Sequence, residues 1–206
     1  MESLSYNPFI KHTLDKILAF TALIFLSPFL LIIALLIRID SVGPVLFAQR
    51  RVGEKLRSFM LYKFRTMTCQ TQHGSTQFNP GDTCRVTRIG AMLRSTKLDE
   101  LPELFNILKG EMSIIGPRPE VPSFVAIYPD DFGKVLQARP GLSDFASIKY
   151  RNEEVILAAQ NEPEVYYQDV ILPDKLRLAK QYVENISFKT DAKIMAATIT
   201  GILGEK

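Results

Sequence analysis

ILAFTALIFLSPFLLIIALLI, residues Ile17–Ile37, is an uncharged apolar run of 21 residues near the start of the sequence. A helix needs about 20 such residues to cross the hydrocarbon core of a bilayer. A cleaved signal peptide fits poorly, because the run is too long and no small-residue cleavage site follows it. The stretch decides the fold class, since the rest of the chain must then work beside a membrane.

Ser27-Pro28 stands at the midpoint of this run. Proline removes a backbone donor, clashes with the preceding turn and biases Ser27 away from helical geometry, so we expect a bend or break there. Basic residues lie on both sides of the run, which gives no inside-outside asymmetry. A re-entrant helix-break-helix hairpin over residues 1–38 explains both features. A straight span with a proline kink and the buried helix of a soluble domain remain the alternatives.

The other 168 or so positions, residues 39–206, suit one catalytic domain of ordinary size. Hydrophobic residues make up 47% of the chain and the formal net charge is only +3, so the protein is no polycation. Cys69 and Cys84 belong to no C-x-x-C pair and no His/Cys cluster spaced for zinc, which argues against a disulfide scaffold. His12 and His73 are isolated, which leaves no two-histidine metal site and no Ser-His-Asp triad. Acid-base or nucleophilic chemistry must therefore come from carboxylates and lysines.

Seven basic residues stand against two acids between Arg38 and Thr68. They predict either a basic surface beside anionic lipid headgroups or a site for phosphates. Alternating apolar residues predict strands at 45–49 and 59–64, with Gly53 turning between them. The polar residues 69–87 predict a long loop of the kind that can act as a lid.

Helical periodicity returns over residues 88–108, 134–137, 174–184 and 191–203. The last of these is amphipathic. It predicts either a helix that packs on the body of the domain or one that lies on the membrane surface.

The segment STKLDELPELFNIL, residues 95–108, holds the best catalytic candidate. Ser95 or Thr96 can cap a helix and Pro102 is tolerated in its first turn. Asp99 would then lie near the amino end on the polar face, where the helix dipole favours an ionised carboxylate. Such a carboxylate can attack phosphorus or bind magnesium. An acid that only stabilises the first turn is the alternative.

Three arginines add phosphate-binding character. Arg94 precedes Asp99 by five residues, and its planar fork suits a diphosphate. Arg118 is fixed between two prolines and Arg139 precedes a Pro-Gly pair, which restricts their backbones. Structural loops of the same composition are the alternative for both.

These motifs together resemble the small monotopic phosphoglycosyl transferases of the bacterial sugar transferase family. The matching stretches run in order from about residue 10 to about residue 199: Ser27-Pro28, Phe47-x-Gln49-x-Arg51-x-Gly53, Lys63-Phe64-Arg65-Thr66-Met67, Arg94 through Leu98-Asp99-Glu100, Gly116-Pro117-Arg118-Pro119, Arg139-Pro140-Gly141, and Tyr182-Val183 through Ser187-Phe188 to Asp191.

The resemblance implies a mostly helical α/β fold with a small β element: a re-entrant membrane hairpin and a catalytic domain with amphipathic surface helices, on the cytoplasmic face of the bacterial inner membrane. It implies an enzyme of the EC 2.7.8 type. This enzyme would transfer a sugar-1-phosphate from a UDP-sugar to undecaprenyl phosphate, as the first membrane step of O-antigen, capsule, exopolysaccharide or glycoprotein assembly. Magnesium is the implied cofactor.

Residue roles follow from the same resemblance. Asp99 would be the nucleophile that forms a covalent phosphosugar intermediate, and it would also bind magnesium. Glu100 would be the second member of a catalytic dyad. Phosphate-binding roles fall to Arg94, Lys63 and Arg65. Nucleotide-binding roles fall to Pro117, Arg118, Pro119, Arg139 and Arg151. The implied partners are the UDP-sugar, undecaprenyl phosphate, membrane lipid and downstream glycosyltransferases; a homodimer stays open, and no nucleic acid is expected.

The sequence departs from the family pattern after Arg139. Residues 143–147 replace a stretch in which many members carry a tryptophan and a glutamine, Ala179 stands where an acid is frequent, and residues 153–173 read as an insertion. These departures leave the sugar undetermined. A membrane-bound UDP-sugar hydrolase and a non-enzymatic membrane adaptor are the competing functions.

Overall fold

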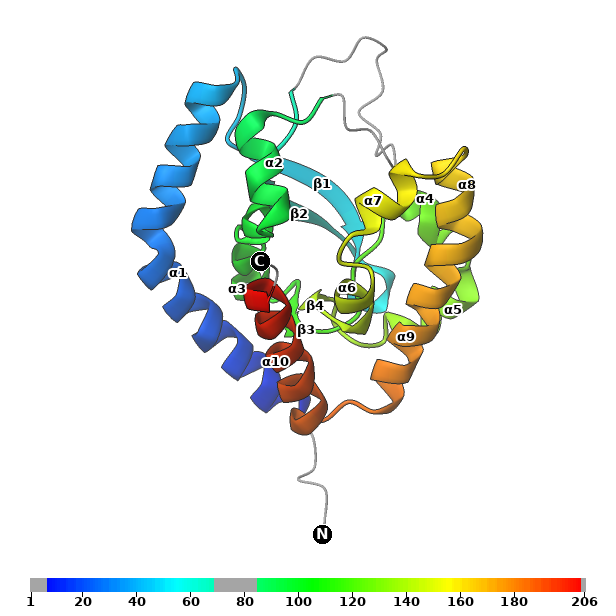
Figure 1. The fold of residues 1–206 in the computed structure, drawn as a ribbon. Coiled ribbons are helices and arrows are strands. Elements are labelled where there is room, and N and C mark those ends of the chain that lie inside the picture. The colour runs from blue at the N-terminus through cyan, green and yellow to red at the C-terminus, as the bar shows by residue number, and fades with distance from the viewer. Residues whose placement is uncertain (1–6, 69–84, 205–206) are drawn as a thin grey trace.

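The computed structural model describes residues 7–68 and 85–204. The protein is mostly helical with two small two-stranded sheets, and one long apolar helix, α1 (Pro8–Asp40), runs along one side (Figure 1). Within the described ranges, α1 is the one helix long and apolar enough to cross a membrane, judged by length and composition. The predicted class, a helical α/β domain with a small β element and an apolar N-terminal helix, is confirmed.

Helix α1 is bent near its middle, as Figure 1 shows, and Pro28 lies inside it. Proline cannot donate to the carbonyl of Ile24, four residues earlier. The Ser27 hydroxyl donates to that carbonyl instead, at 2.8 Å. Because Ser27 supplies the missing donor, the two halves form one continuous helix, and the predicted break takes the form of a bend.

One face of α1 packs on the domain. Its buried residues follow helical spacing along that face: Lys11, Asp15, Ala19, Ile33 and Ile37. On other faces, Phe25 and Leu31 are 79% and 71% exposed. An exposed apolar surface of this extent suits contact with lipid.

Strands β1 (Leu46–Val52) and β2 (Ser58–Phe64) form an antiparallel hairpin, as predicted. They are joined by Gly53 and a short 3-10 turn, η1 (Glu54–Leu56). A Cβ at Gly53 would lie 3.0 Å from the ring of Phe59, so the turn favours glycine there. The loop predicted at 69–87 falls almost wholly outside the described residues.

The prediction of one helix over residues 88–108 is wrong. The stretch is divided into α2 (Arg88–Ser95), a 3-10 turn η2 (Leu98–Glu100) and α3 (Glu103–Lys109). Lys97 adopts the left-handed conformation, with φ of 58°, which ends the first helix. Thr96 therefore closes α2 rather than capping a new helix, and its hydroxyl donates to the Met92 carbonyl at 2.8 Å.

A second sheet pairs β3 (Ser113–Ile115) with β4 (Gly141–Ser143) in parallel. A Cβ on Gly141 would lie 2.1 Å from the amide nitrogen of Gly116, so this close approach requires glycine. The remaining elements are α4 (Pro122–Val125), α5 (Pro129–Val135), α6 (Phe145–Lys149), α7 (Glu153–Ala158), α8 (Pro163–Tyr166), the π-helical turn η3 (Tyr167–Ile171), α9 (Leu172–Glu184) and α10 (Phe188–Gly204).

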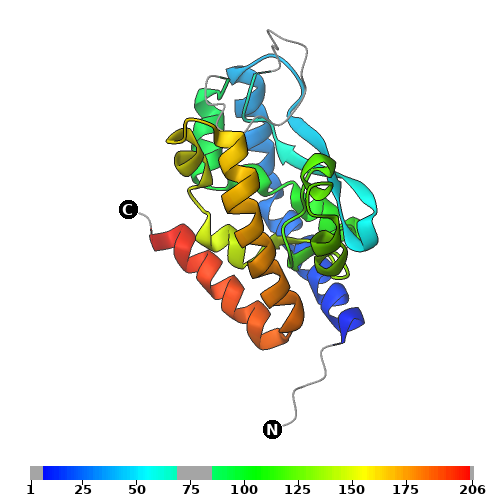
Figure 2. The same ribbon diagram turned by 90° about the vertical axis from the view of Figure 1, so that its right-hand side faces the viewer.

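Helix α10 packs on the body of the domain, which is the first of the two predicted alternatives. Ile194 is fully buried, and the Thr198 hydroxyl lies 2.6 Å from that of Ser143 in β4. Figure 2 shows α9 and α10 in front of the domain, with α1 on its far side. Because α1 extends to Asp40 and packs against α2 and α3, the domain boundary at residue 38 stays a prediction.

Candidate active site

Asp99 and Glu100 lie in η2, between α2 and α3. Asp99 is buried, and its Oδ1 atom has no hydrogen-bond partner in the described part of the chain. Burial raises the pKa of Asp99, while the positive charge of Lys63 acts in the opposite direction. The structure therefore holds an orphaned carboxylate oxygen at the position predicted for the nucleophile.

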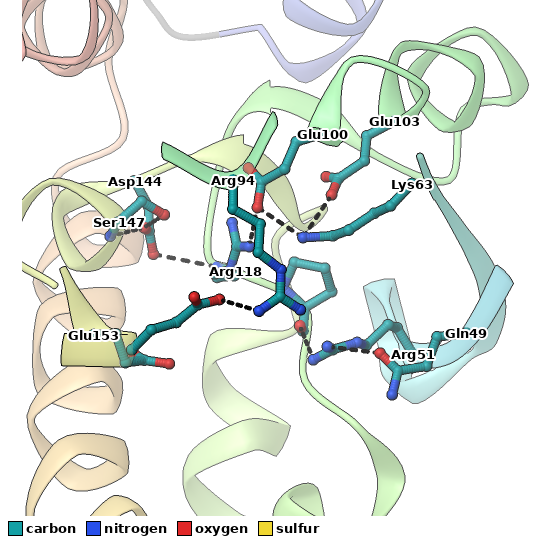
Figure 3. Close-up of polar contacts among 12 residues, drawn as sticks. Gln49, Arg51, Lys63, Arg94, Glu100, Glu103, Arg118, Asp144, Ser147 and Glu153 are labelled. Atoms are coloured by element: carbon teal, nitrogen blue, oxygen red, sulfur yellow. Dashed lines mark hydrogen bonds and ion pairs between the residues drawn. The ribbon is translucent and has the colours of Figure 1, made fainter. Parts of the chain in front are cut away.

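Glu100 differs sharply from its neighbour because two cations bind it. Lys63 Nζ lies 2.7 Å from Glu100 Oε1, and Arg118 donates to the same oxygen (Figure 3). Burial by itself would raise the pKa of Glu100, but these two cations outweigh it and hold the pKa well below its usual range. Glu100 is thus a permanently charged anchor for Lys63 and Arg118.

A third carboxylate, Glu103, completes the cluster, although it was not among the predicted site residues. Its side chain is 1% exposed, and its Oε1 lies 3.4 Å from Lys63 Nζ. Burial raises the pKa of Glu103 to about 7, since the single lysine it shares with Glu100 does not offset desolvation. The available signal was its position four residues after Asp99, on the same predicted polar face.

Asn106 explains why that polar face points inward. Its Oδ1 accepts from the Tyr62 amide at 3.1 Å, and its Nδ2 donates to the Met60 carbonyl at 2.7 Å. The side chain therefore pairs with the edge of β2 as a neighbouring strand would. This contact sets Lys63 of β2 against the carboxylates of η2 and α3.

The loop after β3 delivers Arg118. Its amide donates to Asp144 Oδ2 at 3.2 Å, and the other oxygen of Asp144 accepts from the Ser147 amide at the start of α6. The Pro117 carbonyl accepts from the Gly141 amide at 2.9 Å. The flanking prolines and the parallel strand pair together fix the loop, so the arginine is preorganised toward Glu100.

A cleft of ≈ 610 Å³ lies between α2 and the start of α7. Arg94 and Arg151 line it, and Arg94 reaches Thr66 Oγ1 at 2.9 Å and Glu154 at 3.1 Å. Its lining also includes Lys97, two residues before Asp99. The cleft therefore combines positive charge with proximity to the acid pair, which suits a phosphate-bearing ligand.

The side chains of Arg65 and Arg139 contact other parts of the protein than Asp99, Glu100 and Glu103. The Arg65 guanidinium donates to the Ser41 carbonyl at 2.7 Å, just past the end of α1. Arg139 lies 3.4 Å from Glu54 in the η1 turn. The structure therefore brings Lys63, Arg94 and Arg118 to the acids but shows Arg65 and Arg139 in contacts with α1 and the hairpin.

The side chains around Asp99 could supply only part of the coordination shell of a magnesium ion. Among residues 7–68 and 85–204 there is no cluster of three or more His, Cys, Asp or Glu side chains that could hold a metal. Magnesium commonly takes one or two carboxylates and completes its shell with water and substrate phosphates. Asp99, with its unpartnered Oδ1, fits that role, whereas Glu100 is already neutralised by Lys63 and Arg118.

The structure thus packs a helix long and apolar enough to cross a membrane near a buried acid pair whose neighbours are lysine and arginine side chains, which suits a membrane-associated protein that handles phosphate groups. Residues 6–205 match the model of the bacterial sugar transferase family. The chain belongs to that family.

Two curated relatives are similar over almost the whole chain. The UDP-N-acetylgalactosamine-undecaprenyl-phosphate N-acetylgalactosaminephosphotransferase of Aeromonas hydrophila is 38% identical over 95% of this chain and 44% of its own length. The UDP-glucose:undecaprenyl-phosphate glucose-1-phosphate transferase of Xanthomonas campestris pv. campestris is 37% identical over 93% of this chain and 38% of its own length. The chain thus spans less than half of either relative.

A third relative is closer in size. The exopolysaccharide production protein ExoY of Rhizobium meliloti (strain 1021) is 33% identical over 93% of this chain and 84% of its own length. The family is therefore shared by proteins of the same extent and by much longer ones.

Proposed function

We propose that the protein transfers a sugar-1-phosphate from a UDP-sugar to undecaprenyl phosphate, producing polyprenyl-diphosphate-sugar and UMP as the first membrane step of glycan assembly. The observation that carries the proposal is the buried Asp99 with an unpartnered oxygen beside Glu100, Lys63 and Arg118. The names of the Aeromonas and Xanthomonas relatives support the same donor and acceptor classes.

The proposed reaction has two displacements at the sugar-bearing phosphorus. In the first, a bond forms between an Asp99 oxygen and phosphorus while the bond from phosphorus to the UMP oxygen breaks, and UMP leaves. In the second, a phosphate oxygen of undecaprenyl phosphate attacks the same phosphorus, and the carboxylate of Asp99 leaves. No proton or redox partner is needed, and one site serves two bulky substrates in turn.

The surrounding residues would orient and neutralise the donor. Arg94 and Arg151 would bind phosphate oxygens in the cleft, and the 117–119 loop would contact the uridine. Arg118 and Lys63 bind Glu100 and stabilise its charged form. The charged form of Asp99 is therefore the less stabilised of the two. Magnesium, when bound, would supply charge neutralisation to the diphosphate, with Asp99 as its protein ligand.

The bend of α1 supports a re-entrant anchor on the cytoplasmic face of the bacterial inner membrane. A helix that enters and leaves one leaflet would keep the whole catalytic domain on one side. Undecaprenyl phosphate presents its charged end at that surface, where the donor also arrives. Downstream glycosyltransferases would then extend the lipid-linked sugar.

UMP release by the detergent-purified protein tests the proposed function. A panel of UDP-sugars with magnesium would be incubated with and without undecaprenyl phosphate, beside an Asp99→Asn variant. We expect multiple turnovers only with the lipid and with one or few sugars, and a loss of at least about a thousandfold in the variant. Equal turnover without lipid would instead establish a UDP-sugar hydrolase, and no turnover with any donor would favour a non-enzymatic adaptor.

A further inference from the structure

The Phe47-x-Gln49-x-Arg51-x-Gly53 motif has no role in the chemistry described above, and the insertion at 153–173 reaches the cleft only through Glu154 and Val155. In the structure these two segments meet behind the 117–119 loop. Arg51 of β1 donates through Nη1 to the Pro119 carbonyl at 3.1 Å, and its Nη2 donates to Gln49 Oε1 at 2.9 Å. Figure 3 shows this pair beside the loop, on the opposite side of Arg118 from the Asp144 cap.

Glu120 links Arg51 to the insertion. Its Oε2 lies 3.2 Å from Arg51 Nη1, and its Oε1 accepts from the Tyr167 hydroxyl at 2.7 Å. The Glu120 backbone carbonyl also accepts from the Val52 amide at 2.9 Å. Glu120 is therefore held by side-chain and backbone contacts immediately after Pro119.

Tyr167 is the contribution of the insertion to this network. It is 2% exposed and lies in the π-helical turn that leads into α9. Lys175 lies over its ring, with its Nζ 4.8 Å from the ring centroid and 3.3 Å from the hydroxyl, and pairs with Glu153 at 2.5 Å. A buried carboxylate such as Glu120 needs all of its partners to stay charged without a large desolvation cost.

We propose that Tyr167 is a positioning residue for the donor-binding loop, acting through Glu120 and Arg51. The hydroxyl of Tyr167 orients the Glu120 carboxylate, and this carboxylate orients the guanidinium group of Arg51. The guanidinium group in turn holds the Pro119 carbonyl. The insertion thereby sets the shape of the loop that presents Arg118. This inference rests on the proposed function for its kinetic consequence, although the contact chain itself does not.

Tyr167→Phe tests the proposal, because it removes the hydroxyl and keeps the ring. Tyr128→Phe is the matched control, since the part-buried Tyr128 hydroxyl donates to the Gln168 carbonyl at 3.2 Å and contacts neither Glu120 nor Arg51 in the described hydrogen bonds. A hydrogen bond to a charged group commonly corresponds to about a tenfold change in equilibrium. We therefore expect Tyr167→Phe to raise the KM for the UDP-sugar about tenfold with kcat within about twofold, and Tyr128→Phe to leave both within about twofold.

Hydrogen exchange and thermal unfolding distinguish failure of this positioning role from failure of the proposed function. Hydrogen exchange of the peptide that covers residues 113–121 needs no substrate, and we expect it to accelerate in Tyr167→Phe but not in Tyr128→Phe. If the wild-type protein turns over no UDP-sugar, the proposed function fails while this exchange result still decides the positioning role. Equal KM values and equal exchange in the two variants, with a similar drop in Tm, would overturn the proposal and leave Tyr167 a packing residue.

Discussion

At the scale of single residues, three neighbouring acids differ in the cations that reach them. Glu100 binds Lys63 and Arg118, Glu103 shares only Lys63, and Asp99 keeps an unpartnered oxygen. Their pKa values therefore move in different directions although all three side chains are buried. Divergent pKa values among adjacent acids are characteristic of reactive sites.

Glu103→Gln should change how stability depends on pH. The pKa of Glu103 is about 7 in the folded protein, above the 4.5 of an exposed glutamate, so the folded state holds the proton more tightly than the unfolded state. Wild-type stability is therefore lost as pH rises from about 5 to about 8, by on the order of 3 kcal/mol from this group. Glu100, whose pKa is lowered, is ionised in both states across this window and contributes no slope.

Denaturant unfolding at pH 5 and pH 8 checks this expectation. Relative to wild type, Glu103→Gln should be more stable at pH 8 than at pH 5, so the free energy of unfolding of the variant minus that of wild type should be larger at pH 8. Glu184→Gln, an exposed position in α9, should show no such difference. A wild-type-to-variant difference that stays constant with pH would show that Glu103 does not titrate in this range.

At the scale of elements, α3 is attached to the hairpin through Asn106. Asn106→Ala would leave the Tyr62 amide and the Met60 carbonyl without their partner, which should cost roughly 3 kcal/mol of unfolding free energy. Because this contact also places Lys63, transfer activity should fall as well. Asn185→Ala is the control, since its side chain donates to the Gln181 carbonyl at an exposed site. Thermal unfolding that shifts equally in both variants would refute the role of Asn106.

Pro28→Ala tests the cause of the bend in α1. Alanine restores a donor for the Ile24 carbonyl and removes the ring clash, so the helix should straighten and a larger fraction of molecules should span the bilayer. A reporter enzyme fused to the N-terminus and assayed from the periplasmic side would detect this change. Pro44→Ala, beyond the end of α1, should leave the topology as it is. Unchanged topology in both variants would mean that Pro28 does not determine how α1 is placed in the membrane.

The sequence predicted the elements with a strong local signal and missed those set by tertiary contacts. The apolar run, the hairpin around Gly53 and the last two helices follow from hydrophobic pattern and turn chemistry. The break at Lys97 escaped prediction because a lysine in the left-handed conformation carries no local signal. The three-residue strands β3 and β4 are too short for periodicity to reveal them, and their pairing depends on the close approach of Gly116 and Gly141.

In the candidate site, Lys63 and Arg118 contact Glu100 and Arg94 lines the neighbouring cleft, whereas the catalytic roles of Asp99 and Glu100 stay predictions. The inward direction of Glu103 and Asn106 could not be predicted, because a polar helical face normally points to solvent. Here it points to a strand edge whose backbone groups need partners, which only the folded structure reveals.

At the scale of the whole molecule, a buried ion pair joins the first helix to the start of the last one. Lys11 of α1 lies 2.5 Å from Asp191 at the start of α10, and the Tyr182 hydroxyl of α9 donates to the other oxygen of Asp191 at 2.8 Å. Figures 1 and 2 both show these helix ends together at the lower end of the molecule. Helix α1 is thereby fixed to the rest of the protein at a second place besides α3.

Asp191→Asn should destabilise the protein by roughly 3–5 kcal/mol, because it leaves the charge of Lys11 buried without its counterion. Adding Lys11→Met to Asp191→Asn should recover part of that loss, since the uncompensated charge is then removed. Asp169→Asn, at an exposed position, should have almost no effect. Tm values in detergent would measure all three, and a double variant as unstable as the single one would argue against a pair that couples α1 to α10.

The mass of the protein after reaction with the donor alone tests the central claim most directly. Wild-type protein would be mixed with magnesium and its UDP-sugar without undecaprenyl phosphate, quenched, digested and analysed by mass spectrometry. We predict that the peptide containing Asp99 gains the mass of one sugar phosphate, that adding undecaprenyl phosphate before the quench removes it, and that Asp99→Asn never gains it. Lipid-dependent transfer that proceeds with no adduct, and that survives in Asp99→Asn, would contradict the account.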